Sequence, residues 1–505
     1  MSERTSDRAD VQNLPFSNKF MIACLLYFLA LKLVISFTMQ PLGDEAYYWL
    51  WGKNPAWSYF DHPGLAGWVL GLSSAIFGDN LIGLRAVSLA TTVGSAFVLF
   101  LYARRLAPEQ TKANWLFVLL VVAASPTLFV WSTIVYHDHL LIFLTLGSLY
   151  CFTAYFSDIA KGQSGQVSTL YLGALVLGLA GLTKYSAVFV GLAVALLVLF
   201  HPKLRPLLRS VHIYAAGLIS VIMQAPTIYW NLNRDFASFG FHLNDRHGAD
   251  WLTAFNTDAF FNFLLATIIL FGPFLIGPFI KLFRTKTEAN FAGIGVWFAR
   301  LVTIMSTGTF MFIAFFSFTL WYWSDLSYIL MLALLPFLRM RKWLAWGHLI
   351  FGGLVITAVT INYVVLPLPN FFGGRDAEAA TVYNWSEVAD FVRNAEEANS
   401  DVAFLATTRF QLGSQLSFAM GRTDITAIEV RPSQFDIWEQ RNQIAGKNAL
   451  ILNDEFGYLD EAKRRFDQIT KVDSLTIERF GYPLLTYDLY LGTNYQPRAT
   501  NLVEQ

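Results

Sequence analysis

The residues of this chain best suited to chemistry lie just after its first apolar segment. Asp44 and Glu45 open an aromatic run, and Asp61 and His62 follow shortly afterwards, directly before a proline. A carboxylate in this position can take a proton from a bound hydroxyl group, which indicates a functional site. The structural alternatives are that Asp44 caps a helix beginning at Glu45, and that Asp61 and His62 form a solvated turn.

Two further ionisable residues, Lys184 and Asp138, lie among apolar residues. An ionisable side chain at membrane depth costs about 2.5 kcal/mol or more unless it is paired or faces a hydrated cavity. We therefore expect the Lys184 side chain to face a ligand. The alternative for Lys184 is an interfacial lysine whose ammonium group reaches the lipid headgroups. Asp138 stands between His137 and His139, but neighbouring positions on a helix point about 100° apart and do not easily share one metal ion.

The segment 231–257 brings together several polar side chains that either complete a site, form a lid or belong to a hydrated loop: His242, Asp245, Arg246, His247 and Asp250. The chain has no HExxH motif and no cysteine-based zinc signature. A divalent metal held by Asp61 and a histidine of this segment stays an open alternative.

The composition is that of a polytopic membrane protein. Of 505 residues, 55% are hydrophobic and only 14% are charged. The 36 basic and 36 acidic residues balance, so no global charge indicates a nucleic acid partner. Cys24 and Cys151 both lie in apolar runs and are expected to be packing residues.

Eleven apolar segments are long enough to suggest membrane-spanning helices. They cover residues 20–38, 82–103, 114–131, 137–157, 169–182, 185–200, 211–229, 258–281, 296–320, 324–338 and 343–366. The first is expected to be a retained helix, because no small-residue cleavage pattern follows it.

Basic residues cluster on every second loop, which by the positive-inside rule places those loops and the tail 1–19 in the cytoplasm. The loop 39–81, the shorter alternate loops and everything after Leu366 then face the periplasm. The loop 39–81 is rich in Trp and Tyr, and is expected to fold onto the helices as interfacial helices. Residues 367–505 are predicted to form a soluble α/β domain, with a helix over 383–398 and strands over 402–406, 449–452 and 484–491.

Several motifs together resemble one family of bacterial membrane glycosyltransferases, those of the GT-C fold that include protein O-mannosyltransferases, the lipid A aminoarabinose transferase and rhizobial galacturonosyltransferases. The resemblance rests on the motifs at 43–51, 59–63, 181–186, 226–239 and 433–438, and so spans nearly the whole chain. The galacturonosyltransferase branch is the most similar.

The resemblance implies an all-helical membrane domain over residues 20–366 and a transferase of the bacterial inner membrane. Its donor would be a sugar on a polyprenyl-phosphate carrier, and its acceptor a hydroxyl group of an envelope lipid, glycan or protein. By the same resemblance Asp44 is the general base, and the substrate-binding residues are Glu45, Asp61, His62, Asp138 and Lys184. The relatives place Glu-Lys-Pro where this chain has Asp61-His62-Pro63, so the second position is usually a cation. The resemblance therefore implies that His62 or its neighbours help hold the donor phosphate, and that Asp61 positions a metal or the acceptor.

Two other classes of protein stay open on the sequence alone. A secondary transporter would also place Asp138, Lys184, Arg300 and Asp325 at membrane depth, although no repeated halves are visible. A non-catalytic assembly protein of the envelope would use its soluble domain to bind a partner. Neither the sugar nor the acceptor is specified by these residues.

Overall fold

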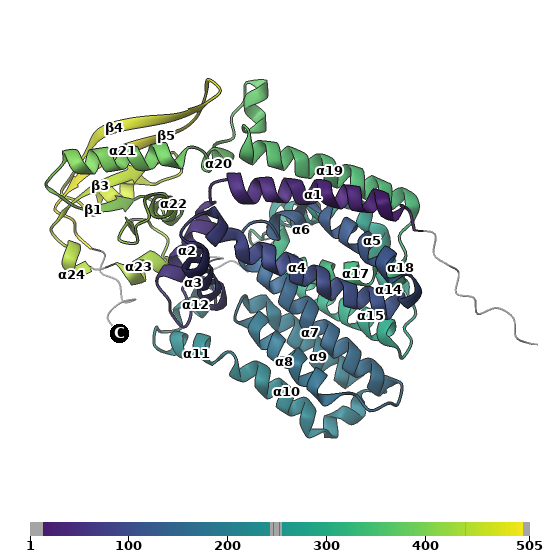
Figure 1. Ribbon diagram of the computed structural model, residues 1–505. Helices are drawn as coiled ribbons and strands as arrows, with labels where there is room; N and C mark the ends of the chain where they lie inside the picture. The colour runs from purple at the N-terminus through teal and green to yellow at the C-terminus, as the bar shows by residue number, and fades with distance from the viewer. Residues whose placement is uncertain (1–13, 243–245, 247–251, 253–254, 440, 498–505) are drawn as a thin grey trace, which may run out of the picture.

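The computed structural model describes residues 14–242, 246, 252, 255–439 and 441–497. Figure 1 shows a bundle of helices with a smaller part, containing a sheet, at one end. The helices of the bundle are α1 (Asn18–Thr38), α4 (Leu81–Leu106), α5 (Thr111–Ala123), α6 (Pro126–Trp131), α7 (His137–Ala160), α8 (Val167–Gly181), α9 (Val188–Phe200), α10 (Val211–Ile222), α11 (Ala225–Leu232), α12 (Ala237–Gly240), α13 (Thr257–Phe271), α14 (Ile276–Arg284), α15 (Phe291–Val302), α16 (Gly308–Ala314), α17 (Asp325–Ala333), α18 (Leu335–Leu338) and α19 (Lys342–Val364).

Five helices of the described residues are long and apolar enough to cross a membrane. They are α1, α4, α7, α19 and a continuous helix, Phe291–Ala314, in which a π-helical turn joins α15 to α16. Two bent pairs raise the number to seven if each is one span: α10 with α11 bends by 47°, and α13 with α14 by 88°. The predicted mostly helical protein with several membrane-length apolar helices is therefore confirmed.

The predicted number of eleven spans is not confirmed, because several apolar segments form short or divided helices. Segments 169–182 and 185–200 form α8 and α9, which have only 15 and 13 residues. Segments 114–131 and 324–338 are each divided in two, and Pro126 and Pro336 lie in the first turn of the second helix. Proline has no amide hydrogen to continue the preceding helix, so it is accommodated at such a start.

The loop 39–81 folds into two helices, α2 (Gly43–Lys53) and α3 (Leu65–Phe77). The aromatic side chains of α2 are buried inside the protein: Tyr47, Trp49 and Trp51 are each at most 1% exposed. Gly52 and Gly71 allow α2 and α3 to approach closely, because a Cβ atom on Gly52 would lie 2.6 Å from the backbone nitrogen of Gly71. The loop thus packs between the bundle and the C-terminal part, while part of α3 stays exposed.

A fully buried ion pair joins this loop to the bundle. Arg85 of α4 donates from Nε and Nη2 to Glu45 at 3.0 and 2.7 Å, and both side chains are 0% exposed. Its Nη1 donates to the carbonyls of Ile35 and Met39 at the end of α1. Glu45 also accepts from the backbone amides of Leu42 and Val135. All these groups are satisfied, so the pair is tolerated without water.

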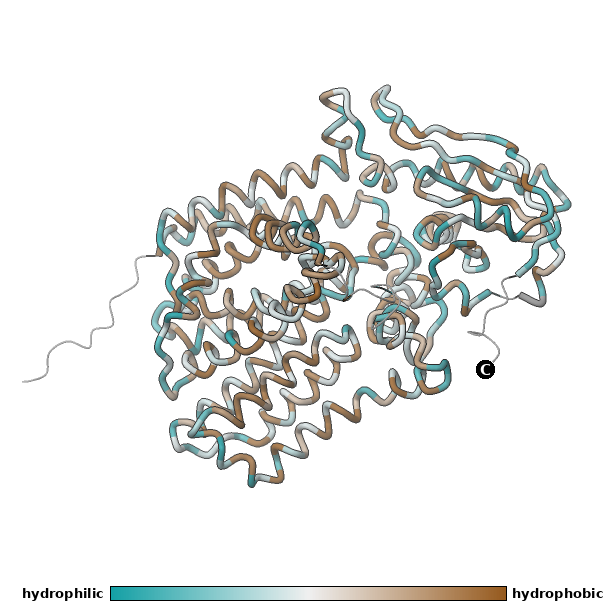
Figure 2. The backbone as a smooth tube through the Cα atoms, turned by 180° about the vertical axis from the view of Figure 1, so that it is seen from behind, coloured by the Kyte–Doolittle hydropathy of each residue, from teal (hydrophilic) through white to brown (hydrophobic). Residues whose placement is uncertain are grey.

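The C-terminal part contains a five-stranded sheet in the order β2-β1-β3-β5-β4. Its strands are β1 (Val402–Thr407), β2 (Thr426–Ala427), β3 (Asn448–Asn453), β4 (Gln468–Arg479) and β5 (Tyr482–Thr493), and its helices are α20 (Ala377–Ala380), α21 (Trp385–Ala398), α22 (Phe410–Met420), α23 (Gln434–Trp438), α24 (Arg441–Ile444) and α25 (Leu459–Lys463). Strand β1 is parallel to β2 and β3, whereas β5 is antiparallel to β3 and β4. The predicted helix and the three predicted strands lie in α21, β1, β3 and β5. Figure 2 shows more hydrophilic residues here than along the bundle helices.

Helix α22 packs directly on α2. A Cβ atom on Gly43 would lie 2.4 Å from the Cβ of Gln411, so only glycine fits at that contact. The side-chain amide of Gln415 donates to the carbonyl of Pro41 at 2.9 Å. The C-terminal part is therefore fixed to the loop that carries Asp44.

We expect replacement of Arg85 by alanine to lower the stability of the protein strongly. The substitution leaves the Glu45 carboxylate buried without a cation, which costs about 3–5 kcal/mol. Thermal unfolding of the detergent-solubilised protein measures this. The matched control is Lys53→Ala, which removes a partly exposed ion pair with Asp79 and is expected to cost less than about 1 kcal/mol. Equal melting temperatures for the two variants would contradict the role given to Arg85.

Candidate active site

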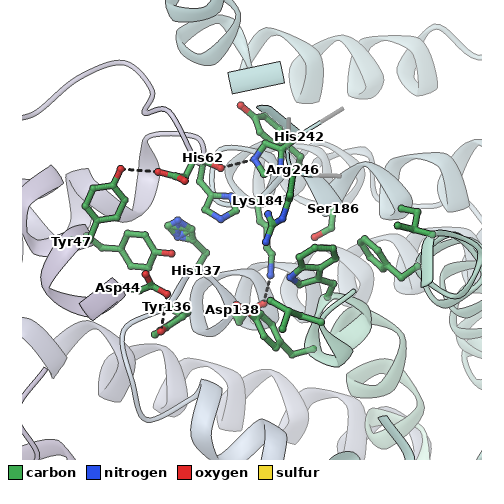
Figure 3. Close-up of a pocket in the computed structure, with 18 of the residues that line it drawn as sticks. Asp44, Tyr47, His62, Tyr136, His137, Asp138, Lys184, Ser186, His242 and Arg246 are labelled. Carbon is green, nitrogen blue, oxygen red and sulfur yellow. Dashed lines mark hydrogen bonds and ion pairs between the residues drawn. The ribbon is translucent and has the colours of Figure 1, made fainter. Parts of the chain in front are cut away.

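A cavity of about 660 Å³ lies where the loop 39–81, the bundle and the C-terminal part meet. Figure 3 shows that its labelled side chains come from different elements and gather around one space. Its polar lining includes Asp44, Asp61, His62, Tyr136, His137, Asp138, Lys184, His242, Arg246 and Arg431. Val188, Phe189, Phe310, Ile313 and Leu320 give it an apolar side. The cavity can therefore hold a ligand with a polar head and an apolar chain.

Five of the six predicted site residues line this cavity, and Glu45 does not. Asp44, Asp61, His62, Asp138 and Lys184 are brought together from three distant stretches of the chain. Glu45 points away from the cavity and binds Arg85 and two backbone amides. Of the polar residues noted in the segment 231–257, His242 and Arg246 line the cavity, whereas Asp245, His247 and Asp250 lie outside the described residues.

Asp44 lies in the first turn of α2 and faces the cavity. The cap position belongs to Leu42, and Asp44 makes no capping hydrogen bond. Its Oδ2 accepts from the hydroxyl of Tyr136 at 3.0 Å. Burial raises the pKa of Asp44, and the Asp61 carboxylate raises it further, against the Tyr136 hydrogen bond and the charges of Arg431 and Arg246. A carboxylate with a raised pKa and an accessible oxygen is a suitable proton acceptor.

Asp61 is held by residues from three parts of the chain. Its carboxylate accepts from Tyr47 at 2.7 Å and from Nη2 of Arg431 at 2.8 Å. Its backbone carbonyl accepts from Nε2 of His242 at 2.6 Å. Burial raises the pKa of Asp61, and the charge of Arg431 opposes this rise.

His62 lies beside two other histidines in the cavity. Its ring centroid is 4.2 Å from that of His137 and 5.5 Å from that of His242. Burial lowers the pKa of His62 well below its ordinary value, and that of His242 to about 4. Both are therefore neutral at pH 7, and His62 offers hydrogen bonds rather than positive charge. Among the residues that the structure describes, no group of three or more His, Cys, Asp or Glu side chains is placed to hold a metal ion.

Lys184 and Asp138 form a direct ion pair of 2.7 Å, with both side chains nearly buried. The ammonium group of Lys184 also lies 5.2 Å from the centre of the Tyr322 ring. Asp325 is buried nearby, with no hydrogen bond to either carboxylate oxygen. The sequence predicts that Lys184 faces a ligand, and the resemblance implies that Asp138 binds substrate, but neither predicts that the two residues pair with each other.

The remaining positive charge comes from two arginines. Arg246 packs on the Trp323 ring at 4.1 Å, and Arg431 packs on Phe241 at 4.8 Å. The sequence does not predict Arg431 as a site residue, because it lies in the C-terminal part, far along the chain from Asp44 and Asp61. The signal that could have identified it is the motif 433–438, which follows it by two residues.

Comparison with known proteins relates this chain to membrane glycosyltransferases. Residues 61–230 match the family described as dolichyl-phosphate-mannose-protein mannosyltransferase. The chain is 33% identical over 199 residues to the lipid A galacturonosyltransferase RgtD of Rhizobium johnstonii, with 38% of each chain covered. It is 32% identical over 124 residues to the undecaprenyl phosphate-alpha-4-amino-4-deoxy-L-arabinose arabinosyl transferase of Shewanella sediminis, covering 25% of this chain and 20% of that protein. The matches thus span less than two thirds of either relative.

The fold is similar to that of a solved enzyme over almost the whole length. The structure of ArnT from Cupriavidus metallidurans bound to undecaprenyl phosphate aligns with a TM-score of 0.60 over 96% of this chain and 100% of that one. The apo form of the same protein aligns with a TM-score of 0.59. The sequence identity is only 14% and 13%, so this likeness establishes the fold alone. The resemblance predicted from the motifs is therefore confirmed: this chain is homologous to RgtD and the arabinosyl transferase, matches the mannosyltransferase family over residues 61–230, and has the GT-C fold of ArnT.

Proposed function

We propose that this protein is an inverting glycosyltransferase of the bacterial inner membrane. It moves a sugar from a polyprenyl-phosphate carrier to a hydroxyl group of an envelope acceptor on the periplasmic face. The observation that carries the proposal is the cavity itself, in which Asp44 faces a polar space bordered by cations on one side and apolar residues on the other. The names of the two relatives, which transfer sugars, favour this proposal over the transporter and the assembly protein.

The reaction needs one base and one stabilised leaving group. Asp44 accepts the proton of the acceptor hydroxyl while that oxygen attacks the anomeric carbon of the sugar. The bond from the anomeric carbon to the phosphate oxygen breaks, and its electron pair leaves with the carrier phosphate. Attack from the face opposite the phosphate inverts the anomeric centre.

The polyprenyl-phosphate carrier binds in the same cavity. Its phosphate lies near Lys184, Arg246 and the neutral His62, which offer charge and hydrogen bonds. Its prenyl chain follows the apolar side formed by Val188, Phe189, Phe310, Ile313 and Leu320. Asp138 keeps Lys184 oriented toward the cavity. Glu45, through its ion pair with Arg85, holds the loop that carries Asp44 on the bundle. Acceptors that fit the proposal are lipid A or other lipopolysaccharide, a glycan, or a protein hydroxyl.

Replacing Asp44 by asparagine is expected to abolish most of the transfer. The amide cannot take the proton, so kcat should fall by about 10²- to 10⁴-fold. The assay uses purified protein, a mixture of radiolabelled polyprenyl-phosphate sugars and an outer-membrane lipid extract. The control is Asp79→Asn, which changes a carboxylate of the same loop outside the cavity. Label transfer by Asp44→Asn at the wild-type rate would rule out Asp44 as the base.

The pH dependence of transfer should follow the ionisation of Asp44. The base must be ionised, so kcat/KM is expected to rise with pH through the pKa of Asp44. Because burial and Asp61 raise that pKa, the midpoint of the rise should lie above the ordinary value of about 4. A profile of kcat/KM between pH 4 and 8 measures it. A midpoint at or below pH 4 would contradict the environment described for Asp44.

Lys184 is expected to contribute to binding of the carrier phosphate. Replacing it alone leaves Asp138 buried without a cation, which costs about 3–5 kcal/mol of stability. The informative variant is therefore Lys184→Met with Asp138→Asn, which removes both charges together. We expect this double variant to fold and to bind undecaprenyl phosphate at least about 10-fold more weakly, a loss of about 1.4 kcal/mol. Unchanged binding would remove Lys184 from the donor site.

A further inference from the structure

One junction ties together three segments that are far apart in the sequence. We call it the Asp61 junction; it consists of Tyr47, Asp61, His242, Arg431 and Gln434. Besides the three contacts to Asp61, the backbone amide of Gln434 donates to the Tyr47 hydroxyl at 2.7 Å. The side-chain oxygen of Gln434 accepts from the amide of Phe60 at 2.9 Å. The loop 39–81 is thus bound to the C-terminal part directly beside Asp44.

Aromatic packing fixes the same junction. The ring of Tyr47 stacks on Phe435 with centroids 6.0 Å apart and planes 7° apart, and lies 4.8 Å from Phe410. The guanidinium of Arg431 lies between Phe241 and Phe410, at 4.8 and 5.4 Å from the ring centres. Arg431 is therefore oriented on both sides, although its side chain is 47% exposed.

We propose that Arg431 is a positioning residue of the transfer site: by binding Asp61 it holds the C-terminal part against the loop 39–81, and its charge offsets that of Asp61 beside the base Asp44. This inference rests on the proposed function. Through Arg431 the C-terminal part completes the wall of the cavity and supplies one of its charges.

The charges around Asp44 determine what removal of Arg431 does. The loop 39–81 contributes Asp61, Tyr48 and the neutral His62, and α7 with the residue before it contributes Tyr136, His137 and Asp138. Lys184, Tyr322, His242 and Arg246 face the same cavity from the other elements of the bundle, and Arg431 faces it from the C-terminal part. Without Arg431, Asp61 loses its direct cation, and Asp44 loses one of the positive charges that favour its ionised form. Asp44 then becomes harder to ionise, because a like charge disfavours the ionised form.

A purely structural role for Arg431 predicts something different. If the arginine only held the parts together, its loss would lower the melting temperature and the amount of active protein, but the pH profile of the active fraction would stay in place. The acid limb is the pH range in which kcat/KM rises on the acid side of its pH profile. Its position therefore separates the two roles of Arg431.

The test compares Arg431→Gln, Arg431→Lys and Asp61→Asn, and the double variant Asp61→Asn with Arg431→Gln, in purified full-length protein. The donor is whichever polyprenyl-phosphate sugar supports transfer by the wild type. The control is Arg422→Gln, an arginine paired with Glu396 and Asp424 on the C-terminal part and outside the cavity. Each variant is assayed for kcat, KM and their pH dependence, and its melting temperature is recorded.

For Arg431→Gln we expect kcat/KM at neutral pH to fall about 10-fold or more and the acid limb to move up by about one pH unit. Arg431→Lys keeps the charge and should hold the limb near its wild-type position. The double variant removes both charges and should return the limb toward the wild type, whereas Asp61→Asn alone should move it down.

Two results would overturn the inference. One is a wild-type rate and profile in Arg431→Gln; the other is a loss of activity in which the acid limb does not move and the double variant restores nothing. Absence of transfer by the wild type from every carrier would overturn the proposed function, and this inference with it. Failure of the inference and failure of the proposed function therefore give different results.

Discussion

The geometry of the site depends on the buried ion pair between Glu45 and Arg85. Consecutive residues on a helix point about 100° apart, so the binding of Glu45 to Arg85 turns Asp44 toward the cavity. Glu45 also accepts from the amide of Val135, the residue before the one whose hydroxyl donates to Asp44. Glu45, which does not line the cavity, thus sets the direction of Asp44 and of its hydrogen-bond partner Tyr136. The adjacent acids Asp44 and Glu45 therefore make different contacts, and the sequence motif alone does not tell which of them faces the cavity.

Much of the site is predictable from sequence because charged residues among apolar ones are costly. Asp138 and Lys184 stand out for that reason, and Asp44, Asp61 and His62 because they follow a membrane segment. Long apolar runs such as 20–38 and 343–366 likewise predict α1 and α19, since few other structures satisfy the backbone within a membrane. Alternating or continuous apolar runs predict β1, β3 and β5.

What the sequence does not predict are contacts between distant segments. The pairing of Lys184 with Asp138, the burial of Glu45 by Arg85 and the position of Arg431 all join residues tens to hundreds of positions apart. Breaks at Pro126 and Pro336 divide apolar runs that look continuous by hydropathy. Strand β4 is mostly exposed and lacks the continuous apolar run that identifies β1. These features depend on tertiary packing, which a local pattern does not contain.

The charges that line the cavity also fit the proposed transfer reaction. Three carboxylates, those of Asp44, Asp61 and Asp138, face three cations, those of Lys184, Arg246 and Arg431. Two direct pairs form, which leaves Asp44 without a cation and Arg246 without a carboxylate within the described part of the chain. In the proposed reaction, the donor phosphate pairs with Arg246 and the acceptor hydroxyl donates its proton to Asp44, so each of these two groups gains a partner.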